Sequence, residues 1–126
     1  MILGLLLAVG TAGMTMGTEL SGADWHPIYL SASELPAGSD MVVQFTPDGK
    51  ISGYGGCNQF FGAYSLSGNH IEIGPVASTR KGCPGIIEVE SAFFATLRAA
   101  NSFTQEGDTL VLYDAAGNKL VQFVRD

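Results

Sequence analysis

The chain has 126 residues, of which 46% are hydrophobic and 14% are charged. This length suits a single domain, and this composition argues against intrinsic disorder. The formal net charge is −6, and Arg80 and Lys81 are the only adjacent pair among the 6 cations. An acidic chain with scattered cations does not favour binding to nucleic acid or to an anionic membrane surface. The 17 glycines favour a turn-rich β protein over a helical bundle.

The first 18 residues carry no charge, and they include an apolar run over 2–9. That run is shorter than the roughly 20 residues that a transmembrane helix needs, so no transmembrane span is expected. Its length is typical of a secretory leader, and Gly10-Thr11-Ala12 is a small-x-small cleavage signal. We expect a signal or leader segment over 1–18 and one domain over 19–126. An ordinary N-terminal tail is the alternative, because no Lys or Arg precedes the run. No cysteine follows the run, so a lipoprotein anchor is not supported.

The domain is expected to open over 20–30, where Trp25 is the candidate core anchor, and to continue in a loop over 31–40. Residues 41–45 then follow the two-residue period of a strand, with alternate apolar side chains on one face. The strand is expected to end there, because Pro47 and Gly49 follow shortly after it.

A hairpin turn is predicted at 46–50, where Pro47 presets its own φ and Gly49 accepts a positive φ. The return strand is expected over 51–56. Three glycines in this short strand indicate a bulge, a bend or a close approach of another backbone.

Two more strands are predicted, at 60–66 and at 70–73, with a turn at 67–69 between them. In the second strand, Ile alternates with polar residues, which indicates one solvated face. A short extended piece is expected over 76–80.

The hydrophobic period then changes to that of a helix. Pro84 suits a first helical turn, where its missing N–H costs nothing, and Asn101 can end the helix. Glu88 and Glu90 lie near the positive end of the helix dipole, and Arg98 lies near the negative end. The apolar stripe consists of Ile86, Val89, Phe93, Leu97 and Ala100.

The chain closes with a second hairpin, in which strands over 109–113 and 119–125 flank a turn at 114–118. Strands on both sides of a single helix, joined by short hairpins, indicate an antiparallel sheet with that helix packed on it. Bending at the glycines is expected to curl the sheet. The sequence therefore predicts an α+β fold, with a curled antiparallel β-sheet as a partial barrel and one packed α-helix.

Cys57 and Cys83 are the only cysteines. In an exported protein an even number of cysteines favours pairing, and two permit one intramolecular bridge. Such a bridge is expected to stabilise the fold by about 3 kcal/mol. The alternative is a pair of reduced, buried thiols in a cytosolic protein. A redox-active pair is not expected, because the two do not form a Cys-x-x-Cys motif.

The residue pattern provides little for metal or cofactor chemistry. His26 and His70 share no metal-binding motif with the cysteines, so we expect no metal site. The segment 53–58 is only superficially similar to a dinucleotide-binding fingerprint, because its last glycine is replaced by Asn58 and no helix is expected to follow it. We expect no cofactor.

Catalytic constellations are equally sparse, and we expect a protein that is not an enzyme. No Gly-x-Ser-x-Gly nucleophile turn is present. A nucleophilic pair of Cys57 and His70 is an alternative that a disulfide at Cys57 would forbid. The neighbouring carboxylates, Glu88 with Glu90 and Glu106 with Asp108, are interpreted as helix capping and solvation. No catalytic residue is assigned.

Several motifs occur together along nearly the whole chain after the leader. They are Leu20-Ser21-Gly22-x-x-Trp25; Gly53-Tyr54-Gly55-Gly56-Cys57-Asn58-x-x-x-Gly62-x-Tyr64; Thr79-Arg80-Lys81-x-Cys83-Pro84; a helix with Glu90, Phe94 and Leu97; and Gly107-Asp108-x-Leu110-x-Leu112 before Gly117 and Phe123. This pattern resembles the META domain family, which includes proteins similar to the heat-shock protein HslJ. The motif positions singled out on this basis are Gly53, Gly56, Asn58, Thr79 and Arg80.

The resemblance implies an exported or envelope-associated protein linked to heat shock, antibiotic tolerance or virulence, with no established catalytic residues. The leading hypothesis is a noncatalytic, monomeric protein, secreted or in the periplasm or cell envelope, that supports stress tolerance through contacts with an unknown envelope protein. The alternative is a carrier of a small apolar ligand or lipid in a cavity between sheet and helix. The residues expected to line that cavity are Met41, Phe45, Phe60, Tyr64, Phe93 and Leu97. The same side chains are equally suited to fill one another's space as a core.

Overall fold

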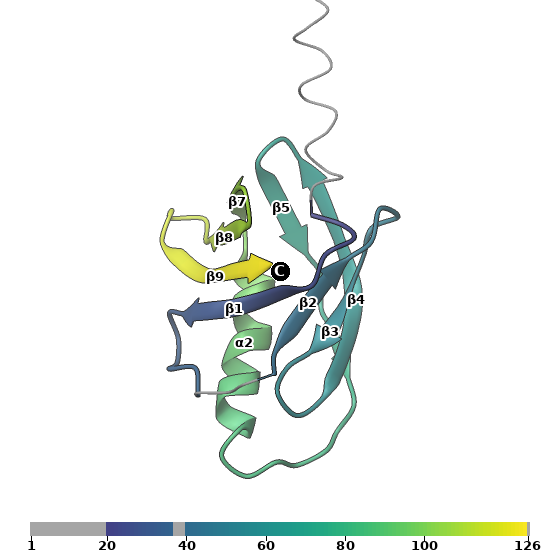
Figure 1. The fold of residues 1–126 in the computed structure, drawn as a ribbon, viewed down its shortest axis with the longest axis vertical. Coiled ribbons are helices and arrows are strands. Elements are labelled where there is room, and N and C mark those ends of the chain that lie inside the picture. Colours follow the sequence, from purple (N-terminus) through teal and green to yellow (C-terminus); the bar gives the residue numbers. More distant parts are fainter. Residues whose placement is uncertain (1–19, 37–39, 126) are drawn as a thin grey trace, which may run out of the picture.

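A computed structural model describes residues 20–36 and 40–125 of the chain. The leader segment predicted over 1–18 lies outside the described residues. In chain order, the structure contains β1 (Trp25–Leu30), β2 (Val42–Phe45), β3 (Lys50–Tyr54), β4 (Gln59–Ser67), β5 (His70–Ile73), β6 (Ala77–Ser78), α2 (Ile87–Ala99), β7 (Ser102–Glu106), β8 (Thr109–Tyr113) and β9 (Lys119–Arg125) (Figure 1).

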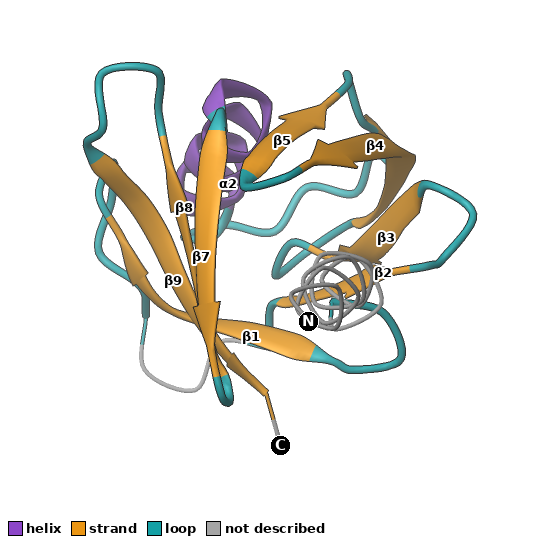
Figure 2. Cartoon of the chain, turned by 90° about the horizontal axis from the view of Figure 1, so that it is seen from above, coloured by secondary structure: helices purple, strands orange, loops and turns teal. Residues whose placement is uncertain are grey.

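The strands form a closed antiparallel barrel rather than the partial barrel that the sequence predicts. Neighbouring strands follow the order β3-β2-β1-β9-β8-β7-β5-β4, and β3 also pairs with β4, which closes the ring of eight strands. Viewed from above, the strands are arranged in a ring, and α2 lies at one side of it between β8 and β5 (Figure 2). The predicted antiparallel sheet with one helix is confirmed, and closure is the correction. It arises because β4 pairs with β3 at its start and with β5 at its end.

Two narrow seams join the two halves of the barrel. β1 pairs with β2 at Trp25 and Val43, and β5 pairs with β7 at His70 and Ser102. Backbone hydrogen bonds beside the second pair, such as Ile71 N–H to the Asn101 carbonyl at 2.9 Å, extend that seam. Local hairpins build the half from β2 to β5, whereas the other half includes the pairing of β1 with β9 from opposite ends of the domain. Closure therefore depends on contacts between residues distant in sequence.

The core lies between the inner face of the barrel and α2. Trp25 is fully buried, as predicted, and its indole N–H donates to the Leu20 carbonyl at 2.9 Å. Phe93 of α2 packs edge-on against Phe60 and Phe123, with ring centroids 6.1 and 6.3 Å apart. The helix thus joins the two halves of the barrel through aromatic contacts.

The predicted helical stripe is confirmed, because Val89, Phe93, Leu97 and Ala100 are buried and Ile86 packs against the core. Pro84 precedes the helix instead of occupying its first turn, since α2 begins at Ile87. Within the described part of the chain, no helix is both long enough and apolar enough to cross a membrane.

Strand β7 has no counterpart in the sequence prediction. Of its residues only Phe103 is buried, so the apolar alternation that marks a strand is weak there. The strands predicted at 70–73, 109–113 and 119–125 match β5, β8 and β9. The turn at 46–50 is also confirmed, with Gly49 at a φ of +89°.

Candidate functional site

The two cysteines form the predicted disulfide. The Cα atoms of Cys57 and Cys83 lie 5.9 Å apart, and the bond joins positions separated by 26 residues. It ties the loop between β3 and β4 to the segment before α2. Because Cys57 is bonded and fully buried, the nucleophilic pair of Cys57 with His70 is excluded in this form of the protein.

Beside the disulfide lies a buried carboxylate, Glu90, which is only 4% exposed. Its Oε2 accepts hydrogen bonds from the backbone N–H groups of Asn58, at 2.6 Å, and Cys57, at 3.1 Å. Its Oε1 accepts a bond from the side-chain amide of Asn58 at 2.8 Å. The interpretation of Glu90 as a solvated residue of the helix entrance is therefore wrong, because this carboxylate holds the loop between β3 and β4.

Asn58 connects this carboxylate to the segment that follows β6. Its Oδ1 accepts hydrogen bonds from the Thr79 hydroxyl at 2.8 Å and the Lys81 backbone N–H at 2.6 Å. Its amide nitrogen also donates to the Lys81 carbonyl at 3.1 Å. We call Cys57, Asn58, Thr79, Lys81 and Glu90 the Asn58 network. It joins three chain segments that are separated in sequence.

The Asn58 network is satisfied internally. Among the described residues, no buried side-chain nitrogen or oxygen lacks a hydrogen-bond partner. Buried polar groups with complete hydrogen bonding specify and rigidify a local structure. Glu90 and Asn58 are therefore engaged in holding the fold, and their polar groups are committed to neighbours within the chain.

The glycines of the family motif make room for this arrangement. A Cβ on Gly53 would lie 2.0 Å from the Val42 carbonyl oxygen, which no side chain can approach so closely. A Cβ on Gly55 would lie 2.8 Å from Glu90 Oε2. Gly56 adopts a φ of +103°, a conformation that residues with a Cβ rarely adopt. The predicted close backbone approach is thus present at Gly53.

Arg80, the remaining motif position, is exposed at the rim of a groove. The groove has a volume of about 550 Å³ and runs between the β6 segment and α2. We call it the β6 groove. Its lining includes Val76, Ser78, Thr79, Arg80, Lys81, Ile87, Ser91 and Phe94.

The six residues predicted to line an internal cavity lie together in the core. Met41, Phe45, Phe60, Phe93 and Leu97 are each at most 2% exposed. Tyr64 is half-buried, its ring lies edge-on to Phe45 with centroids 5.0 Å apart, and its hydroxyl donates to the Thr46 carbonyl at 2.6 Å. These ring contacts favour mutual packing, and ligand binding at these residues stays a prediction.

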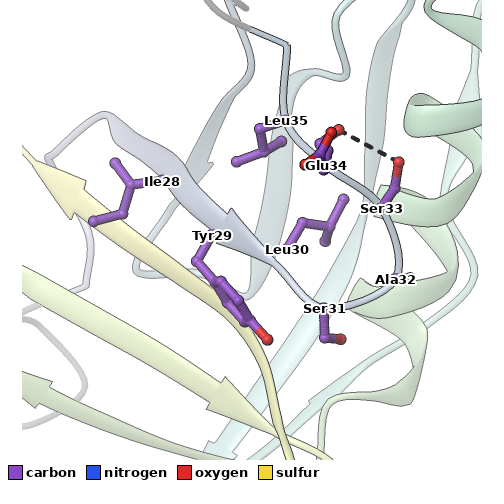
Figure 3. Close-up of a pocket in the computed structure, with 8 residues that line it drawn as sticks. All are labelled: Ile28, Tyr29, Leu30, Ser31, Ala32, Ser33, Glu34 and Leu35. Atoms are coloured by element: carbon purple, nitrogen blue, oxygen red, sulfur yellow. Dashed lines mark hydrogen bonds between the residues drawn. The ribbon is translucent and has the colours of Figure 1, made fainter.

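A second hollow lies where β1 runs into the following loop, over residues 28–35 (Figure 3). Ile28 is 54% exposed and Tyr29 is 43% exposed. The Lys119 ammonium lies 4.6 Å from the Tyr29 ring centroid, a cation–π contact between β9 and β1. This hollow offers apolar surface and hydroxyl groups, which suit contacts with another molecule.

The two histidines lie apart from the Asn58 network. His26 Nδ1 lies 3.3 Å from the Met41 carbonyl oxygen, and His70 is exposed on β5. No group of three or more His, Cys, Asp or Glu side chains within residues 20–36 and 40–125 is arranged to hold a metal ion.

The fold has solved counterparts at low sequence identity. A protein from Burkholderia xenovorans, solved by NMR, is similar with a TM-score of 0.68 at 20% identity, over 87% of this chain and 86% of that one. A DUF4847 family protein from Bacteroides vulgatus, solved by crystallography, has a TM-score of 0.65 at 16% identity, over 85% of this chain and 94% of that one. No curated protein matches the chain significantly. The META domain family matches residues 18–126. This match covers every motif described above, and the chain belongs to the META domain family.

Proposed function

We propose that this META domain protein works outside the cytoplasm as a noncatalytic envelope protein that supports stress tolerance by contacting another protein. The observation that carries the proposal is that polar side chains of the family motifs form hydrogen bonds within the protein itself. Asn58 and Thr79 form hydrogen bonds within the Asn58 network, and Glu90, the buried carboxylate, accepts three of them. Groups committed in this way support a fixed scaffold rather than proton transfer.

The disulfide is consistent with an oxidising compartment, because such bonds persist mainly in exported proteins. The uncharged, apolar start of the chain supports export for the same protein. A role in stress or antibiotic tolerance is the expectation that the family resemblance provides.

One experiment tests compartment and mode of action together. One portion of the envelope fraction of its native host is acid-quenched and alkylated in denaturant, and the mass of the protein is measured. A second portion is left untreated, and the mass of the protein is measured under native conditions. We expect no alkylated cysteine and no bound small molecule. Two alkylated thiols would contradict export, and a co-purifying apolar ligand would favour the carrier function instead.

Protein contact is tested with a photoreactive amino acid at exposed positions, including Tyr29 and Ser91. We expect a discrete cross-linked species from at least one position after irradiation of intact cells. A photoreactive residue at Ala115, in the exposed turn between β8 and β9, is the background control. No species above that background from any tested position would overturn the proposal.

A further inference from the structure

Strand β6 has one edge that the barrel does not use. β6 pairs with β4 at Ser78 with Phe60 and at Ala77 with Phe61, and it is the last strand in the sheet order. Within the described residues no strand pairs with its other edge. Unpaired strand edges offer backbone groups to a further strand.

The hydrogen-bond pattern identifies which groups this edge offers. The Thr79 N–H donates to the Gln59 carbonyl at 3.0 Å, so Thr79 faces β4. Successive residues of an antiparallel strand direct their N–H and C=O groups to opposite sides. The backbone N–H and C=O of Ser78 therefore point away from β4, at the edge that borders the β6 groove.

The exposed charged residues that line the groove are two cations, in a protein that is acidic overall. Arg80 and Lys81 line it and are exposed, and neither side chain forms a salt bridge within the described residues. They are the only adjacent cations of a chain with a formal net charge of −6. The first residue of α2, Ile87, lies in the same groove, and no side chain caps that helix end. The acidic residues of that first turn, Glu88 and Glu90, offset the positive end of the helix dipole. The Glu90 carboxylate also lines the groove, where three hydrogen bonds hold it, so the attraction for an anion rests on Arg80 and Lys81.

The groove is held in a fixed shape. The Lys81 backbone is bonded to Asn58 through both its N–H, at 2.6 Å, and its C=O, at 3.1 Å. The disulfide at Cys83 anchors the chain two residues later. A preformed groove lowers the ordering cost of binding an extended segment.

We propose that the β6 groove binds an extended, acidic segment of a partner protein, which adds to β6 as a strand and directs carboxylates to Arg80 and Lys81. This proposal rests on the proposed function in protein contact and names the surface and the class of partner. Main-chain hydrogen bonds at Ser78 supply the strand pairing, and the two cations supply the preference for acidic sequences. Ile87 and Phe94 offer apolar surface beneath the alternate side chains.

The test uses the full domain, labelled with ¹⁵N, and capped ten-residue peptides of alternating Val and Glu. The matched control peptide alternates Val and Lys. We expect amide shifts at Ser78, Arg80 and Ser91 with the acidic peptide only, together with slower hydrogen exchange of the Ser78 amide. Equal binding of both peptides, or no binding of the acidic one, would overturn the proposal.

Two variants separate charge from strand pairing. The double variant R80Q/K81Q is expected to bind the acidic peptide about tenfold more weakly, while K50Q/R98Q, which loses the same charge elsewhere, keeps its affinity. S78P removes the outward N–H without removing a bond to β4, and edge strands tolerate proline. We expect S78P to abolish binding at an unchanged far-UV spectrum. If S78P fails to fold, the exchange rate of the wild-type Ser78 amide decides, and an unchanged rate on binding overturns strand addition.

The cross-linking experiment distinguishes this proposal from the broader one. A cross-link from Ser91 in the groove supports both. A cross-link from Tyr29 alone would preserve function in protein contact and overturn the β6 groove as its surface.

Discussion

The carboxylate of Glu90 and the amide of Asn58 meet in a paired arrangement. Oε1 of Glu90 lies 2.8 Å from the side-chain nitrogen of Asn58, and Oε2 lies 2.6 Å from its backbone nitrogen. This contact crosses 32 residues of sequence and joins α2 to the loop between β3 and β4. Because hydrogen bonds to a buried carboxylate are charge-assisted, the contact is strong and its loss leaves several donors unpaired.

Replacing Glu90 with Ala is expected to lower the free energy of unfolding by about 3 kcal/mol, because three buried donors then lack their acceptor. Glu88→Ala is the matched control. Glu88 is exposed and lies in the same helical turn, so its loss should change stability by less than about 0.5 kcal/mol. Urea unfolding followed by circular dichroism compares the two, and equal effects would contradict a structural role for Glu90.

Asn58→Asp is expected to make the fold sensitive to pH. The new carboxylate would lie against that of Glu90, and repulsion between the two ionised groups would destabilise the folded state. Protonation relieves this repulsion, so stability is retained at low pH and lost as pH rises. We expect a lower urea midpoint for this variant at pH 7.5 than at pH 4.5. A midpoint equal to that of the unaltered protein at pH 7.5 would rule out this repulsion.

Reduction of the bond between Cys57 and Cys83 is expected to destabilise the protein by about 3 to 4 kcal/mol, in the chain-entropy description of a loop of this length. Urea unfolding with and without a phosphine reductant measures the difference. Thiol titration of the unreduced protein in denaturant should give no free sulfhydryl, and denaturant is needed because Cys57 is fully buried in the folded protein. Two titratable thiols before reduction would contradict the disulfide.

Gly53→Ala is expected to destabilise the barrel by more than about 2 kcal/mol, since the added Cβ meets the Val42 carbonyl and must displace β2 from β3. Gly82→Ala is the control, because a Cβ there meets nothing within 4 Å. Thermal melts of both variants provide the comparison. Similar melting temperatures for the two would show that the strands adjust without cost.

Tyr64 is expected to titrate above the ordinary value of a phenol. Burial raises the pKa of its phenol above the ordinary value of 10.0, and the nearby charge of Asp48 raises it further. Because the folded-state pKa is raised, the contribution of this group to stability is present below pH 10 and falls as pH rises through the folded-state value. Alkaline difference absorbance at 295 nm should show a late ionisation step, which Tyr64→Phe removes. Retention of the late step in that variant would assign it to another residue.

The local sequence pattern is sufficient to predict those elements in which buried residues recur at a regular spacing. The stripe of Val89, Phe93 and Leu97 predicts α2 because burial on one helical face leaves a periodic trace. Gly49 similarly marks the turn after β2, since the positive φ needed there is easiest for glycine. The disulfide was expected because two cysteines in an exported protein have one way to pair. Strand β7 escaped detection because only Phe103 faces the core.

Closure of the barrel and the role of Glu90 were decided by tertiary structure alone. A carboxylate in the first turn of a helix has the same local sequence pattern whether it is solvated or buried. Glu90 is buried because it accepts hydrogen bonds from Asn58, which lies on a distant segment of the chain. Closure likewise depends on the pairings of β1 with β2 and β9 and of β5 with β7, which join segments separated in sequence. Sequence periodicity reports which side of an element faces the core. Which element packs against which is decided by contacts between residues distant in sequence, and these contacts produce no periodic pattern in the local sequence.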